Sequence, residues 1–368
     1  MSENTNRKTA LVPIVIPSYE PDDRLITLLK EFDAKGMGPV IIVNDGSDEK
    51  YDPLFDEARA LIEKRGGKFI AYRPNRGKGR ALKTAFAYIA ENMPDALGVV
   101  TADSDGQHSP DCITSIINKL IENPYSLVLG VRQFNKKDIP WKSWAGNTIT
   151  VTVFSYVAGI KVSDTQTGLR GIPFAFMKEL IDCKGERFEY EMQMLLECAK
   201  GYSLVEVPIQ TIYDSKENHQ THFNSVKDSI RIYKILAKRF VKYVFASVSS
   251  FIIDILLFQL FVFILKDSFP ALYVTLATVS ARIISAVYNY LINYKFVFKS
   301  HASRGASLAK YALLAVIQMS LSAGIVSLIM HFFPGILETP VKIVVDMILF
   351  VLSYTVQQRF VFSNKSKK

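Results

Sequence analysis

Short apolar runs alternate with amphipathic segments through the first 220 or so residues of the chain. The apolar runs are rich in β-branched residues and have the length of buried strands: residues 11–17, 40–43, 68–72, 98–102 and 127–130. Segments of helix length lie between them, at residues 24–32, 54–64 and 78–91. This alternation predicts a doubly wound α/β domain with a mostly parallel sheet.

The pattern changes to long apolar runs from residue 241 onward. Residues 311–333 contain no charged side chain, and residues 271–292 contain only Arg282. A helix of about 20 apolar residues crosses the roughly 30 Å hydrocarbon core of a bilayer. We therefore expect an all-α membrane domain with four transmembrane helices, at residues 241–265, 271–292, 311–333 and 341–356. The alternative is that these segments form buried helices of a soluble protein.

Charge divides the chain in the same way. The whole chain has a formal charge of +9, but residues 1–232 hold 29 Lys and Arg against 31 Asp and Glu. This slightly acidic half disfavours nucleic acid as a partner. Ten basic residues fall on one side of the four predicted helices, against Lys266 and Lys342 on the other. The positive-inside rule then predicts a multi-pass protein of the cell membrane, with its first domain and both termini in the cytosol.

The membrane half also repeats itself. The segment NYKFVFKS at residues 293–300 is echoed by QQRFVFSN at residues 357–364, and a Lys-Tyr pair opens the first and third predicted helices. A duplicated helical hairpin with both copies in one orientation explains this echo. The alternative is a chance recurrence of basic and aromatic anchors at cytosolic helix ends.

Two charged residues lie inside the first predicted hairpin. Asp254 and Arg282 are placed symmetrically about its connection, so they reach a similar depth in the bilayer. A charge at that depth is costly unless it is paired. We expect the two to pair or together to bind an anionic head group, with a purely structural ion pair as the alternative.

An acidic segment follows the fourth predicted strand. VVTADSDGQHSP places Asp103 and Asp105 two residues apart, with Gln107 beyond. Alternate carboxylates leaving a strand can bind one hard divalent cation, such as Mg²⁺ or Mn²⁺, which could bridge a diphosphate. The segment therefore predicts a metal site, against the alternative of an acidic loop.

Two further polar segments follow strands. Asp45, in NDGSD, suits hydrogen bonding to a base or ribose, although the segment could be a simple turn. The segment NRGKGRA at residues 75–81 offers backbone donors and the charge of Lys78 to a diphosphate. It matches neither GxGxxG nor GxxxxGK[ST], which disfavours a dehydrogenase or a P-loop enzyme.

Six motifs in this order resemble the family 2 glycosyltransferases, whose GT-A fold is Rossmann-like, and within them the polyprenyl-phosphate sugar synthases typified by dolichyl-phosphate mannose synthase. The motifs are IVIPSYEP, IIVNDGSD, NRGKGRALKTA, TADSDGQHSP, LGVR and SDTQTGLRG. The resemblance implies a nucleotide-sugar site of Pro17, Tyr19, Glu20, Asp45, Lys78, Asp103 and Ser104. It implies a metal site of Asp103, Asp105 and Gln107, and lipid-phosphate contacts from Arg132 and Arg170. The candidate catalytic set is Asp103, Asp105, Arg132, Arg170 and Asp164. Glu20 and Pro21 depart from the family pattern P-x-Y-N-E, which leaves the role of Glu20 open.

The second half resembles the GtrA-like four-span proteins, which accompany such transferases and are thought to move lipid-linked sugars. The expected domains are a cytosolic glycosyltransferase domain at residues 1–222, an interfacial amphipathic helix at residues 223–240 and a membrane domain at residues 241–368.

Trp141 and Trp144 mark a second candidate for an interfacial helix. For both helices, an ordinary core helix is the alternative. His219 and His222 lie in a polar loop that either closes over substrate or is simply solvated.

The implied reaction is inverting transfer of a hexose from a nucleotide sugar to a polyprenyl phosphate at the cytosolic face, for cell-envelope glycosylation. UDP-glucose or UDP-N-acetylglucosamine is favoured as donor, and GDP-mannose stays open. A phosphate acceptor is already anionic and needs little general-base help, whereas an alcohol would need Asp164, Glu189 or Glu191. The alternatives are a lipid-linked sugar transporter with a non-catalytic first domain, and a processive polysaccharide synthase, whose QxxRW signature is absent. Translocation of the product and homo-oligomer formation stay open.

Overall fold

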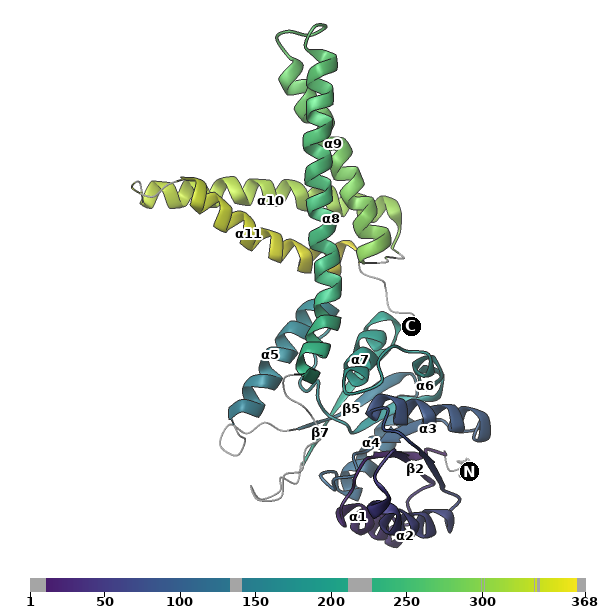
Figure 1. Cartoon of the computed structure of the whole chain (residues 1–368). Helices are drawn as coiled ribbons and strands as arrows, with labels where there is room; N and C mark the ends of the chain where they lie inside the picture. Colours follow the sequence, from purple (N-terminus) through teal and green to yellow (C-terminus); the bar gives the residue numbers. More distant parts are fainter. Residues whose placement is uncertain are drawn as a thin grey trace, which may run out of the picture. The chain divides into compact units, whose positions relative to one another are not determined.

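The computed structural model of the chain describes residues 11–132, 141–210, 227–298, 300, 302–333, 335 and 338–362. The chain forms two compact units (Figure 1). The first unit runs to Ile235 and the second begins at Leu236. This boundary lies inside the linker that the sequence predicts at residues 223–240.

A seven-stranded sheet forms the centre of the first unit. The strands are β1 (Ile14–Ser18), β2 (Val40–Asp45), β3 (Lys68–Tyr72), β4 (Gly98–Thr101), β5 (Ser126–Arg132), β6 (Arg170–Pro173) and β7 (Ser203–Ile209). Their order is β3-β2-β1-β4-β6-β5-β7. Among these strands, β6 alone runs antiparallel to its neighbours β4 and β5, so the predicted mostly parallel sheet is confirmed.

Helices cover both faces of this sheet. They are α1 (Arg24–Ala34), α2 (Asp52–Glu63), α3 (Lys78–Asn92), α4 (Pro110–Glu122), α5 (Trp141–Ala158), α6 (Phe174–Ile181) and α7 (Glu189–Gly201), with a short 3₁₀ turn η1 (Glu49–Tyr51). Every residue of β1, β2 and β4 is buried, as expected for central parallel strands. Ile14 and Ile16 pack in one core with α1, α2 and α4, whereas Val15 between them is buried on the opposite face, because side chains alternate along a strand.

The strand directions bring several polar segments to one edge of the sheet. The parallel strands β1, β2 and β4 all have their carboxyl ends there, and β5 ends there with Arg132. Since β6 is antiparallel, it begins at this edge, and Arg170 pairs with Thr101 at the end of β4. The loop before β6 therefore reaches the same edge as the loops that follow the parallel strands.

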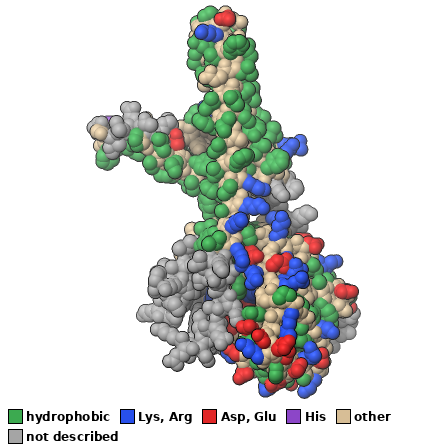
Figure 2. Space-filling view, in the orientation of Figure 1, with side chains coloured by type: hydrophobic (Ala, Val, Ile, Leu, Met, Phe, Trp, Pro, Cys, Tyr) green, Lys and Arg blue, Asp and Glu red, His purple; other side chains and the backbone are tan. Residues whose placement is uncertain are grey.

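Long apolar helices build the second unit. They are α8 (Lys227–Leu265), α9 (Tyr273–Ile292), α10 (Arg304–Phe332) and α11 (Glu338–Val356). The π-helical turn η2 (Asn293–Val297) follows α9, and η3 (Gln357–Val361) follows α11. Figure 2 shows apolar side chains over much of their outer surface. This exposure of large apolar side chains is typical of a protein that lies in a membrane.

Three described segments are long and apolar enough to cross a membrane: Ile230–Leu265, Arg304–Phe332 and Ile343–Val361. The second predicted span forms a 20-residue helix, α9, but it is not among the three. This helix contains Arg282, Asn289 and three tyrosines among its apolar residues. The predicted number of four spans stays a prediction.

The two hairpins of the second unit are built alike at their ends. The π-helical turns η2 and η3 begin at Asn293 and Gln357, the positions that correspond in the sequence echo. The Asn293 side-chain amide donates to Gln357 Oε1 at 3.2 Å. The rings of Phe298 and Phe362, the last residues of the echo's shared FVF, stack with centroids 5.1 Å apart.

Tyrosines repeat the same relation. The ring of Tyr243 on α8 packs against that of Tyr354 on α11, with centroids 5.1 Å apart. Their counterparts, Tyr311 on α10 and Tyr290 on α9, pack in the same way with centroids 5.6 Å apart. Residues that correspond in the two halves thus make corresponding contacts. A chance echo of membrane-interface anchors would not produce this, so the structure supports a duplicated hairpin.

The repeat predicts that corresponding substitutions have similar effects. Phe298→Ala and Phe362→Ala each remove a buried ring from the shared stack and should each destabilise the second unit by about 3–5 kcal/mol. Phe296 and Phe360 also correspond but are 61% and 64% exposed, so their alanine variants should melt close to wild type. Thermal melting in detergent measures all four. Unequal losses for the buried pair, or equal losses for buried and exposed rings, would contradict the repeat.

Candidate active site

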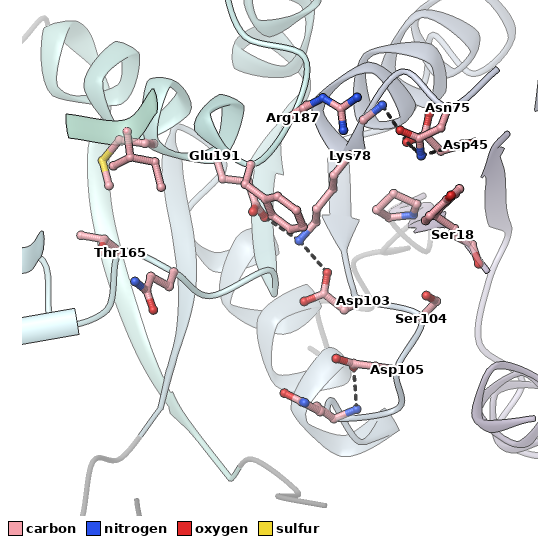
Figure 3. A pocket seen from close by; sticks show the side chains of 18 of the residues that line it. Ser18, Asp45, Asn75, Lys78, Asp103, Ser104, Asp105, Thr165, Arg187 and Glu191 are labelled. Carbon is pink, nitrogen blue, oxygen red and sulfur yellow. Dashed lines mark hydrogen bonds and ion pairs between the residues drawn. The ribbon is translucent and has the colours of Figure 1, made fainter. Parts of the chain in front are cut away.

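A cavity of about 470 Å³ opens at the carboxyl edge of the sheet in the first unit (Figure 3). Nine of the residues predicted for the site line it: Pro17, Tyr19, Asp45, Lys78, Asp103, Ser104, Asp105, Gln107 and Arg132. They come from the ends of β1, β2, β4 and β5 and from the start of α3. Segments far apart in the sequence therefore meet here because their strands end at one edge.

Lys78, at the first position of α3, lies at the centre of the cavity's charges. Its Nζ lies 2.7 Å from Asp103 Oδ1 and 2.9 Å from Glu191 Oε1 (Figure 3). Asp103 follows β4, and Glu191 lies in the first turn of α7. One ammonium group thus joins three elements and bridges two carboxylates.

These contacts set the protonation states. Burial raises the pKa of Asp103, but Lys78 and His108 lower it more, so its pKa lies well below the usual range and the group stays ionised. Burial lowers the pKa of Lys78, but Asp103 and Glu191 outweigh it, so the pKa of Lys78 is raised. Burial and then the charge of Asp103 raise the pKa of Asp105.

The donor set at Asp103 and Asp105 fits a divalent cation. Both carboxylates offer hard oxygen ligands, and a bound cation would offset the burial and the Asp103 charge that together raise the pKa of Asp105. Asp105 Oδ1 also accepts the main-chain N–H of Gln107 at 3.0 Å, which orders this loop. The described residues contain no cluster of three or more His, Cys, Asp or Glu able to hold a metal alone. The remaining ligands would have to come from Gln107, water or a bound diphosphate.

Asp45 has a positioning role in this structure. Its Oδ1 accepts from the Tyr72 hydroxyl at 2.8 Å and the Arg76 N–H at 2.9 Å. Its Oδ2 accepts from the Asn75 side-chain amide at 3.0 Å and the Gly77 N–H at 2.8 Å. A carboxylate accepts about four hydrogen bonds, so this one is fully engaged in holding the loop before α3. Its contact with a nucleoside stays a prediction.

Arg132 and Asp164 form a bidentate ion pair. Arg132 Nε and Nη2 lie 2.6 Å and 3.0 Å from the two carboxylate oxygens of Asp164. The Asp164 side chain is completely buried and also accepts the Gln166 N–H at 2.9 Å. Arg132 lines the cavity and Asp164 does not. Asp164 therefore holds Arg132 in position in this structure, and a catalytic role for Asp164 stays a prediction.

Arg170 lies outside the cavity. Its side chain is 1% exposed and donates to the main-chain carbonyl oxygens of Thr167 at 2.9 Å and Glu191 at 2.7 Å. These contacts tie the loop before β6 to α7 and leave the guanidinium buried. A contact of Arg170 with the acceptor phosphate stays a prediction.

Glu20 also does not line the cavity. Its backbone adopts a left-handed φ of 47°, and its N–H donates to Ser47 Oγ at 2.8 Å. This contact joins the loop after β1 to the loop after β2. The Glu20 backbone therefore shapes the site, and a direct contact of its carboxylate with a donor stays a prediction.

Several site residues have no counterpart in the sequence-based prediction. Thr165, Gln166, Arg187, Phe188, Met192 and Ile232 line the cavity. The sequence indicates Glu191 only as a possible base for an alcohol acceptor, and its contact with Lys78 follows from the fold. Gly168 lies within the recognised SDTQTGLRG motif, but a Cβ there would lie only 2.3 Å from Asp103 Oδ2. The sequence does not indicate this contact, because Gly168 and Asp103 are 65 positions apart and meet only in the folded chain.

The other predicted residues lie elsewhere. Asp254 and Arg282 form an ion pair in the second unit, with Nη2 and Oδ2 3.3 Å apart. Trp141 and Trp144 belong to α5, but their side chains are outside the described part. His219 and His222 lie outside the described residues altogether.

Comparison with known proteins gives two family matches. Residues 14–182 match the profile of Glycosyl transferase family 2, and residues 242–362 match that of the GtrA/DPMS transmembrane domain. The UDP-N-acetylglucosamine–dolichyl-phosphate N-acetylglucosaminyltransferase of Methanococcus voltae is 28% identical over 218 residues, covering 55% of this chain and 86% of its own. The dolichyl-phosphate hexose transferase of Haloferax volcanii is 29% identical over 202 residues, covering 53% and 80%.

A solved structure of the mannosyltransferase PcManGT from Pyrobaculum calidifontis, in complex with GDP-Man and Mn²⁺, aligns with 95% of this chain and 87% of its own. The sequence identity is 15% and the TM-score is 0.38.

The close approach of Gly168 to Asp103 predicts the effect of a single methyl group. Gly168→Ala should force the Asp103 carboxylate to move and weaken Mn²⁺ binding in the presence of nucleoside diphosphate by about tenfold, since metal sites tolerate little displacement of a ligand. Isothermal titration calorimetry measures the affinity. Gly201→Ala is the matched control, because a Cβ at that position meets nothing within 4 Å. Wild-type affinity in Gly168→Ala would show that Asp103 does not bind the metal.

Proposed function

The chain is a membrane glycosyltransferase in which a family 2 glycosyltransferase domain precedes a GtrA/DPMS transmembrane domain, and we propose that it transfers a hexose from a nucleotide sugar to a polyprenyl phosphate with inversion. Two relatives named above act, by their names, on dolichyl phosphate, which is a lipid of this class. The observation that carries the proposal is the single cavity in which Lys78, Asp103, Asp105 and Arg132 converge.

The donor diphosphate would lie at the start of α3. Gly77 and Lys78 open this 15-residue helix, whose N-terminal N–H groups favour an anion. Asp103, Asp105 and Gln107 would hold Mg²⁺ or Mn²⁺, which when bound neutralises charge on the leaving diphosphate. Pro17, Tyr19 and Ser104 line the same cavity and would contact the nucleoside and sugar. UDP-glucose or UDP-N-acetylglucosamine is the favoured donor, with GDP-mannose as the next to test.

The acceptor needs no strong base in this reaction. A phosphate oxygen of the lipid attacks the anomeric carbon while the bond from that carbon to the diphosphate oxygen breaks, which inverts the centre. The attacking oxygen is already ionised at neutral pH, so no proton has to be removed. Arg132, fixed by Asp164, would hold the acceptor phosphate in line.

The second unit would anchor the enzyme at the cytosolic face. We propose that α8, α9, α10 and α11 all cross the bilayer, because the two hairpins repeat one another and three of the segments meet the length and composition of a span. The basic residues at the helix ends support the proposal that the catalytic unit and both termini lie in the cytosol.

Transfer of radiolabelled sugar tests the function. Purified full-length protein is incubated with undecaprenyl or dolichyl phosphate and a panel of UDP- and GDP-sugars, with Mg²⁺ or Mn²⁺. We expect an organic-extractable product whose anomeric configuration is inverted, no product with EDTA, and a loss of at least about 100-fold in Asp103→Asn, because the diphosphate charge is then left uncompensated. Asp111→Asn is the control, since this exposed acid lies on α4 outside the cavity. Nucleotide-sugar binding without product from any donor would contradict the proposal and favour a transporter.

Arg187 gives a second test of the donor site. It lines the cavity, and the described residues supply no side-chain partner for its guanidinium. Arg187→Gln should raise KM for the nucleotide sugar about tenfold and change kcat little, because charge at the diphosphate is lost in the ground and transition states alike. Lys184→Gln, a nearby residue outside the lining, is the control. An unchanged KM would remove Arg187 from the site.

A further inference from the structure

Arg282 is exposed in the middle of an apolar helix. On α9, 71% of its side chain is accessible, and its neighbours Val279 and Ile283 are 52% and 59% exposed. A charged side chain in such surroundings is costly in a bilayer unless a partner compensates it. The nature of that partner is therefore informative.

The partner within the protein is Asp254, but the contact uses little of the guanidinium. Arg282 Nη2 lies 3.3 Å from Asp254 Oδ2, whereas the other carboxylate oxygen accepts the Ser285 hydroxyl at 2.8 Å. Asp254 is only 15% exposed, and Ser285 holds it against α9. Since a guanidinium has five N–H donors, most of those on Arg282 remain turned toward the exposed surface.

The repeat shows that a hairpin of this kind does not require an arginine here. Tyr243 corresponds to Tyr311, which relates Asp254 to Ser322; Asn293 corresponds to Gln357, which relates Arg282 to Asp346. In the second hairpin, the Ser322 hydroxyl donates to Asp346 Oδ1 at 2.5 Å. Both hairpins therefore join these two positions by a polar contact, and the exposed cation is an addition of the first.

We propose that Arg282 binds the phosphate group of an anionic lipid through the guanidinium N–H groups that its contact with Asp254 does not use. The planar donor fork matches phosphate oxygens in a bidentate manner. An arginine exposed to lipid in mid-span extends toward the headgroup region and thins the bilayer locally, which brings a lipid phosphate within its reach. The site lies in the second unit and does not depend on the transfer reaction in the first.

Spin-labelled lipids test this site directly. Full-length protein is reconstituted in phosphatidylcholine vesicles containing spin-labelled phosphatidic acid or spin-labelled phosphatidylcholine, and electron paramagnetic resonance gives the relative affinity of each lipid for the protein surface. Arg282→Gln should lower the preference for phosphatidic acid about fivefold, as expected for loss of one basic contact. Arg282→Lys should retain part of the preference, and Asp254→Asn should raise it, because the guanidinium loses its internal competitor.

Two controls make the result decisive. Lys266→Gln removes an exposed charge from the connection between α8 and α9 and should leave the preference unchanged. Millimolar inorganic phosphate should not compete, whereas competition would mean a site for free phosphate and would contradict the lipid assignment.

Three outcomes would overturn the proposal. A purely structural ion pair predicts lower melting temperatures for both Arg282→Gln and Asp254→Asn, with no change in lipid preference for Arg282→Gln. A contact with a second copy of the chain predicts that Arg282→Gln alters the oligomeric state in light scattering while lipid preference persists. A fall in preference in Asp254→Asn equal to that in Arg282→Gln would show that the two act only as a unit.

Discussion

The contacts of Lys78 with Asp103 and Glu191 join the three segments on which the site of the first unit depends. Lys78 begins α3, Asp103 follows β4 and Glu191 lies at the start of α7. Two carboxylates this close are mutually repulsive, and removing the shared ammonium would leave both partly buried and uncompensated. A single cation thus allows an acidic cavity to form at the edge of the sheet before any substrate arrives.

The same arrangement explains how the site can receive a diphosphate. In the structure, Lys78 already compensates the charge of Asp103, while burial and then the charge of Asp103 keep the pKa of Asp105 raised. A divalent cation would supply the positive charge that Asp105 lacks. Around this centre, Asp45 bonds the loop before α3, Asp164 bonds Arg132, and Arg170 bonds the main chain of α7. These contacts fix the positions of residues that line the cavity.

Much of this site could be predicted from the sequence, because parallel strands carry their carboxyl ends to one edge and the polar segments follow those ends. Asp103, Asp105, Lys78 and Arg132 are of this kind. The burial of Arg170 could not be predicted, since it depends on the antiparallel β6 and on a contact with α7. Gly168 and Arg187 were missed for the same reason, as each acts across a long sequence separation. In the second unit, the echo predicts the hairpin repeat and relates Arg282 to Asp346, but the polar contact that each residue makes within its hairpin follows only from the structure.

The central claim is that Asp103 and Asp105 share one divalent cation with a diphosphate in this cavity. The most direct test is phosphorus-31 electron–nuclear double resonance on Mn²⁺ bound to the full-length protein with nucleoside diphosphate. The account predicts a phosphorus coupling of the size found for directly coordinated phosphate, lost when both aspartates are changed to asparagine. Bound Mn²⁺ without a phosphorus coupling, or a coupling that survives the double substitution, would contradict it.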